Sequence, residues 1–205
     1  MNYEQMATDE VLKKTVNALK TNGVEAEVVE TKEEALEKIK SYIPAGASVM
    51  NGSSRTLEQV GYVDYLKSGK HPWNNLHAGI LAETDAAKQA VLRKQSVISD
   101  FYLGSVHALT EDGQMVIASN TGSQLPHIVF TSQNLIFVVG SQKIAANLDE
   151  ALTRLEKYVF PLEDARMKSV GYGGSQISKL LIFKKENPIM GRKVRVIFVK
   201  EELGF

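Results

Sequence analysis

Apolar positions in the first quarter of the chain change between helical and strand spacing. Residues 8–22 repeat apolar side chains along one face of a helix, and residues 24–30 alternate like a strand. A capping box at 31–34 then opens a second helix, and a short apolar strand follows at 47–50. Strand, helix and strand in this order require a parallel pairing with a crossover, which predicts an α/β fold.

The rest of the chain continues this alternation, with two weakly patterned stretches at 68–75 and 160–178 that we expect to be loops. Residues 135–140 are apolar throughout, which is typical of a central strand that is covered on both faces. The other expected elements are a helix from Thr84, strands at 101–104 and 115–118, a helix capped by Asn147, and closing strands at 180–184 and 194–200.

Composition narrows the class of protein. The 205 residues are most simply one domain, with an N-terminal helix at 8–22, a core from about 24 to 160 and C-terminal strands from about 180 to 200. The 24 basic and 24 acidic residues cancel, so charge gives no argument for binding nucleic acid or an anionic membrane. No secretory signal and no membrane-spanning run is present, and we expect a cytoplasmic protein.

Cysteine is missing from the chain, which excludes disulfides, thiolate catalysis and a thiolate-held iron–sulfur cluster within it. The four histidines form no recognised metal motif, so we expect no metal site.

A glycine- and serine-rich loop follows the strand at 47–50. Gly52 allows the backbone to approach a ligand closely, and Ser53, Ser54 and Thr56 supply hydroxyls at the start of the next helix. Hydroxyls and unpaired N–H groups together favour binding of a phosphate or carboxylate. The alternative is that Ser54 or Thr56 simply caps the helix.

Two further loops have a suitable composition, Thr110–Gly113 and Asn120–Ser123. Strand-end loops of an open α/β sheet converge on one edge, so we expect all three loops to surround one site. Thr121 and Gly122 of the third loop are then candidates to bind the same anion as the first loop.

Three charged or polar side chains are candidates for chemistry at this edge. Glu111 could act as a base or a nucleophile, although Asp-Gly after it favours a hairpin turn. His107 could polarise a substrate oxygen, and Lys143 could provide a counter-charge. The alternatives are a hydrogen-bonded histidine in the core and a solvated lysine.

Four stretches of the sequence, in this order and spacing, resemble the lactate-utilisation (LUD) domain family. They are NGSSRTLEQVG at 51–61, ALTEDG at 108–113, VVGSQKI at 138–144 and GRKVRVIFVKEELGF at 191–205. The chain departs from many relatives at 167–174, where it has no cysteines, at Gly122-Ser123-Gln124 in place of Gly-Asn-Arg, and at His107 in place of Asn.

The resemblance implies a three-layer α/β/α fold with a mainly parallel, Rossmann-like sheet, related to sugar-phosphate isomerases and CoA transferases. It also implies a role in oxidising lactate to pyruvate with iron–sulfur partner subunits.

Our leading hypothesis is therefore a protein that binds a small anionic metabolite. Two alternatives are an autonomous transferase or isomerase that uses Glu111, whose loop resembles the Ser-Glu-Asn-Gly loop of CoA transferases, and a non-catalytic assembly subunit. Related sheets often pair through exposed edges, which makes a homodimer the assembly to test.

Overall fold

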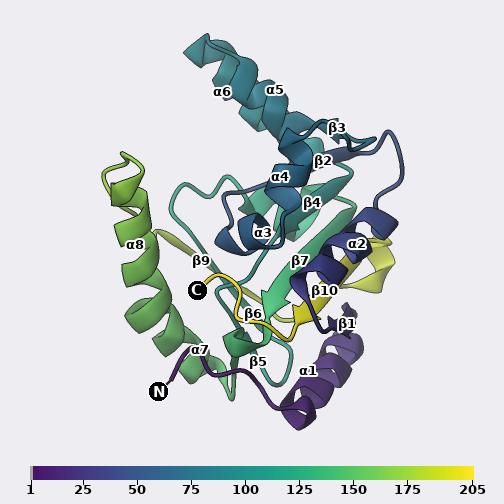
Figure 1. The fold of residues 1–205 in the computed structure, drawn as a ribbon, viewed down its shortest axis with the longest axis vertical. Helices are drawn as coiled ribbons and strands as arrows, with labels where there is room; N and C mark the ends of the chain where they lie inside the picture. Colours follow the sequence, from purple (N-terminus) through teal and green to yellow (C-terminus); the bar gives the residue numbers. More distant parts are fainter. Residues whose placement is uncertain (1) are drawn as a thin grey trace.

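Two β-sheets form the centre of the computed structural model, which describes residues 2–205 (Figure 1). The larger sheet is parallel throughout. Its strands, in spatial order, are β1 (Glu25–Val29), β10 (Lys193–Val199), β7 (Asn134–Gly140), β4 (Phe101–Gly104), β2 (Ser48–Asn51) and β3 (Asn74–Asn75). The predicted α/β class with a mainly parallel sheet is confirmed.

A smaller mixed sheet, which the sequence did not predict, lies beside the larger one. Its order is β8 (Ile144–Ala145), β5 (Ala108–Thr110), β6 (Met115–Ser119) and β9 (Lys179–Phe183). Strand β6 runs antiparallel to β5 and β9, whereas β5 and β8 are parallel. The two predicted closing strands, β9 and β10, therefore belong to different sheets.

Most α-helices begin at a polar cap, and α4 and α8 are the exceptions among residues 2–205. Thr8, Thr31, Ser54 and Asn147 each accept a hydrogen bond from a backbone N–H in the first turn of the helix that follows. The helices are α1 (Asp9–Thr21), α2 (Lys32–Tyr42), α3 (Arg55–Gln59), α4 (Tyr62–Lys67), α5 (Leu76–Ala82), α6 (Ala86–Gln95), α7 (Leu148–Arg154) and α8 (Phe160–Ser169).

Hydrophobic side chains of the larger sheet point alternately into two cores. Ile136 and Val138 of β7 pack into the core beneath α2, α3 and α4. Leu135, Phe137 and Val139 face the other core, which α1 and the smaller sheet cover. This burial on both faces explains why β7 is apolar throughout. The outer face of the smaller sheet packs against α7 and the π-helical turn η4 (Leu155–Val159) in a third core.

Three sequence predictions are corrected. The expected loop at 160–178 contains α8, whose pattern is weak because none of its residues is buried. The irregular segment around 68–75 holds a buried anchor, Trp73, whose Nε1 donates to the carbonyl of Ile43 over 3.1 Å. The helix expected from Thr84 starts at Ala86 and is capped by Asp85.

Figure 1 shows α5 and α6 projecting beyond the larger sheet at the top, and α8 standing apart from that sheet at the left. Within residues 2–205, the helices are all too short or too polar to cross a bilayer.

Candidate functional site

A cavity of about 290 Å³ opens at the carboxyl ends of β2 and β4. One wall comes from segments that follow β2, β4, β6 and β7. They are the loops at 52–56, 105–107 and 119–124 and, after β7, the side chain of Lys143. Turn η4 and α8 form the opposite wall, and Gly204 lies against Thr56 and Lys143 of the first. The site thus lies where an open parallel sheet is expected to bind a ligand, outside the carboxyl ends of its strands.

The first loop follows β2 and is shaped by close packing. A Cβ atom at Gly52 would lie 2.9 Å from Tyr102 Oη, so glycine lets this loop pass directly over the tyrosine. Ser54 Oγ accepts the N–H of Leu57 over 3.3 Å and caps α3, as the simpler interpretation of the sequence proposed. Ser53, Ser54 and Thr56 all line the cavity.

Lys143 is the most unusual residue of the site, because it is a cation that is only 2% exposed. Its Nζ donates to Thr56 Oγ1 over 3.0 Å, to Ser105 Oγ over 3.2 Å and to the carbonyl of Val106 over 3.3 Å. In residues 2–205 no carboxylate forms an ion pair with it. Burial, together with the nearby charge of Arg154, lowers the pKa of Lys143 to about 7.

A second buried cation lies behind Lys143. Arg154 is 2% exposed, and its Nη1 donates to the carbonyl of His107 over 2.6 Å. Its guanidinium lies over the ring of Tyr158, 5.2 Å from the centroid. The ion pairs of the described chain do not include Arg154 either. Of these two buried basic side chains without a carboxylate partner in residues 2–205, Lys143 lines the cavity and Arg154 does not.

His107 lines the same cavity as a neutral donor. Its Nδ1 accepts the N–H of Ala118 over 3.1 Å, so the ring proton of the neutral form is on Nε2. Burial is the main cause that lowers the pKa of His107 to about 4, and the charges of Lys143 and Arg154 add to it. At neutral pH the ring can therefore donate a hydrogen bond to a ligand oxygen but carries no charge.

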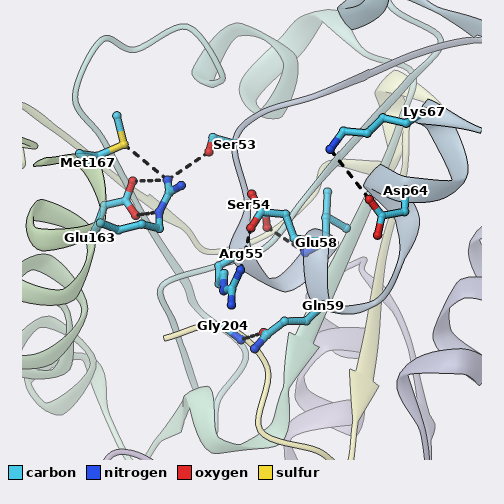
Figure 2. Close-up of polar contacts among 12 residues, drawn as sticks. Ser53, Ser54, Arg55, Glu58, Gln59, Asp64, Lys67, Glu163, Met167 and Gly204 are labelled. Carbon is cyan, nitrogen blue, oxygen red and sulfur yellow. Dashed lines mark hydrogen bonds and ion pairs between the residues drawn. The ribbon is translucent and has the colours of Figure 1, made fainter. Parts of the chain in front are cut away.

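Helix α8 brings an arginine that the sequence did not single out. Arg166 Nη2 donates to Ser53 Oγ over 3.1 Å, and Nε and Nη2 bind Glu163 over 2.7 and 2.8 Å. Figure 2 shows Glu163 and Met167 facing Ser53, and all three residues line the cavity. The contact of Arg166 with Ser53 joins the two walls of the cavity.

The third loop contributes some of its predicted residues. Thr121 lines the cavity together with Asn120, Ser123 and Gln124, whereas Gly122 does not. Gly122 adopts φ +86° and donates its N–H to Ser119 Oγ over 3.0 Å, so its role is to form the turn.

Glu111 does not line the cavity. Of the three loops that we expected to surround one site, those at 51–56 and 120–123 reach the cavity and the one at 110–113 does not. Residues 110–114 form the turn between the antiparallel strands β5 and β6, which was the alternative for this motif. Glu111 pairs with Lys14 of α1 at 2.7 Å, and Asn22 donates to the carbonyl of Asp112 over 3.0 Å. The turn thus fastens the smaller sheet to α1.

Comparison with known proteins decides the family. The model of the LUD domain matches residues 12–178, which is most of the chain. The chain belongs to the LUD-domain family. A crystal structure of a DUF162 family protein from Deinococcus radiodurans is similar in fold, with a TM-score of 0.50 and 11% identity over 95% of this chain and 99% of that one. A search of curated proteins gives no significant match.

In this LUD domain, the structure places residues 167–174, where the sequence departs from the family pattern, at the edge of the site. Residues 167–174 form the end of α8 and the turn after it, and Met167 lines the cavity. In residues 2–205, His, Asp and Glu side chains do not form a group of three that could hold a metal ion.

Sequence reasoning missed several residues of the LUD-domain cavity. They are Tyr102, Ser105, Gln124, Glu163 and Arg166. A signal for the last two exists, because Glu and Arg three residues apart are typical of an exposed helix. Tyr102 gives no such signal, since its strand reads as ordinary core.

Proposed function

We propose that this LUD-domain protein binds a small carboxylate metabolite of the 2-hydroxy acid class, with lactate as the first candidate, in the cavity beside Lys143. We further propose that it acts in lactate utilisation together with subunits that carry iron–sulfur clusters. The observation that carries the proposal is the buried ammonium group of Lys143, which lines the cavity and has no carboxylate partner among residues 2–205.

The charge of the cavity supports a carboxylate ligand. A buried cation is costly unless an anion accompanies it, and here the surrounding protein offers only neutral oxygens to Lys143. A carboxylate would supply the missing charge, and the hydroxyls of Ser53 and Ser54 and the guanidinium of Arg166 would add hydrogen bonds.

The size of the cavity favours a small metabolite. A volume of about 290 Å³ is near the lower end for ligand pockets, which suits a three-carbon acid and not a whole CoA ester. His107 Nε2–H is available to an uncharged oxygen such as the hydroxyl of lactate.

Oxidation of lactate releases two electrons, and the chain has no cysteine to hold a cluster that could accept them. A cluster that accepts them would belong to another subunit, which is the reason to propose iron–sulfur partners.

Isothermal titration of the purified protein at about pH 6.5, where Lys143 is largely protonated, tests the binding step. Lactate, pyruvate, a sugar phosphate and a CoA ester are titrated in turn. We expect lactate or pyruvate to bind, and Lys143→Met to weaken that binding by about tenfold or more. Lys67→Met, which removes an exposed lysine that does not line the cavity, is the matched control. The proposal fails if none of the four compounds binds, or if Lys143→Met binds as the wild type does.

A further inference from the structure

We propose that Lys143 Nζ forms an imine with the carbonyl carbon of a 2-oxo acid bound in this cavity. The inference rests on the proposed function, because it needs a small carboxylate beside Lys143. It adds a covalent activity for the same site and names 2-oxo acids, the oxidised counterparts of 2-hydroxy acids, as its substrate class.

The surroundings of the amine carry the inference. Within residues 2–205, Nζ donates hydrogen bonds to two hydroxyls and one carbonyl, those of Thr56, Ser105 and Val106. Lys143 also lines the cavity. A lysine that serves only to neutralise charge in a protein core is normally paired with a carboxylate, which this one lacks. All three oxygens can accept a hydrogen bond from a neutral amine, and the hydroxyls of Thr56 and Ser105 can also donate to its lone pair.

Two features favour the neutral, nucleophilic form of this amine. The side chain is removed from water, and the guanidinium of Arg154 lies behind it without a counter-ion in the described residues. Desolvation and a neighbouring cation are the two devices that activate a lysine for attack on a carbonyl. Together they lower the pKa of Lys143 to about 7, so a large fraction of the amine is neutral at physiological pH.

The groups around Nζ can move the protons that the reaction requires. The nitrogen lone pair attacks the carbonyl carbon, the C=O electron pair moves to oxygen, and a proton passes from nitrogen to that oxygen to give a carbinolamine. The oxygen then leaves with a second proton as water while the C=N bond forms. Ser105 and Thr56 hydroxyls, both hydrogen-bonded to Nζ, can relay these protons, and no electron donor or acceptor is needed.

Trapping with borohydride tests the imine directly. The wild-type protein is incubated with pyruvate and borohydride, which supplies a hydride to the C=N bond, and the products are analysed by intact mass and peptide mapping. We expect one addition equal in mass to pyruvic acid less one oxygen atom, located on Lys143. Lactate has no carbonyl and should give no addition. Lys143→Arg should lose at least about nine-tenths of the labelling, because its guanidinium is not a nucleophile.

Peptide mapping of the wild type keeps the test independent of how the variant folds. An absence of label on Lys143, or a label confined to other lysines, overturns the inference. Calorimetry separates this from the proposed function. If pyruvate binds but is not trapped, the covalent step is wrong and the binding site stands. If neither lactate nor pyruvate binds, both proposals fail.

Discussion

Lys143 shows how one residue can couple binding, protonation and stability. Its pKa is about 7 in the folded protein and 10.5 in an ordinary exposed lysine, because burial and Arg154 disfavour the charge. Between these two values the unfolded chain binds one proton more than the folded protein. The free energy of unfolding must therefore rise with pH in this window, and the contribution of Lys143 is least favourable below about pH 7.

Replacing Lys143 with Met should remove this pH dependence. Between pH 7 and pH 10, the free energy of unfolding of the wild type should rise relative to Lys143→Met by about 1.4 kcal/mol per pH unit. Urea unfolding of both proteins at several pH values measures the difference, with Lys67→Met as the control. Parallel stability curves for wild type and Lys143→Met would contradict the burial of this charge.

Gly52 makes a second prediction about a single residue. Gly52→Ala places a methyl group 2.9 Å from Tyr102 Oη and should destabilise the protein by about 1 to 3 kcal/mol. Tyr102→Phe removes the colliding oxygen, so the alanine should cost clearly less in that background. Thermal or urea unfolding of the two single variants and the double variant gives the coupling free energy. Strict additivity would show that the loop does not touch Tyr102.

At the scale of elements, α8 closes the outer wall of the site although none of its residues is buried. Within residues 2–205, the hydrogen bond between α8 and the first loop is the one that Arg166 donates to Ser53 Oγ. Arg166→Met should therefore lower the affinity for lactate by about tenfold, while unfolding changes by less than about 1 kcal/mol. Calorimetry and urea unfolding measure the two effects, and Lys168→Met on the same helix is the control. Unchanged affinity would place the ligand away from α8.

For the turn between β5 and β6, in contrast to α8, we expect no effect on lactate binding. Glu111→Gln breaks the ion pair with Lys14 but leaves the cavity untouched, so lactate affinity should not change and stability should fall only slightly. Titration of lactate into this variant checks the prediction. A loss of binding would mean that Glu111 reaches the ligand in a conformation other than this one.

These elements also show what sequence could predict and why. Strand β7 and the capped helices were predictable because burial on both faces and helix caps leave local signals. Helix α8 was missed because an unburied helix has no apolar stripe. Glu111 was expected at the cavity for another reason. Its turn follows a strand of the smaller sheet, and the local sequence does not indicate that β5 pairs with β6 and β8.

At the scale of the whole molecule, two neutral histidines join the buried cations, His127 in the core and His107 at the cavity. Burial is the main cause that lowers the pKa of His107 and of His127 to about 4, against 6.5 for an ordinary histidine. Between about pH 6.5 and pH 4 the histidines bind protons in the unfolded chain but stay neutral in the folded protein. Their contribution to the free energy of unfolding therefore falls as the pH is lowered through this range.

Stability should therefore fall steeply in weak acid. Near pH 5 the two histidines together should give a slope of up to about 2.7 kcal/mol per pH unit, and His127→Gln should remove about half of it. Urea unfolding between about pH 4.5 and pH 6.5 measures both slopes. A wild-type stability that is constant across this range would contradict the neutral, buried state of these rings.

Proton uptake on binding is the most direct test of the claim that Lys143 receives the carboxylate of the ligand. Lactate is titrated calorimetrically at about pH 8 in two buffers of different ionisation enthalpy, where the free amine is mostly neutral. We predict that the wild type takes up a substantial fraction of one proton per lactate, because the bound anion raises the pKa of Lys143, and that Lys143→Met takes up none. A binding heat that is independent of buffer in the wild type, or equal uptake in both proteins, would contradict the account.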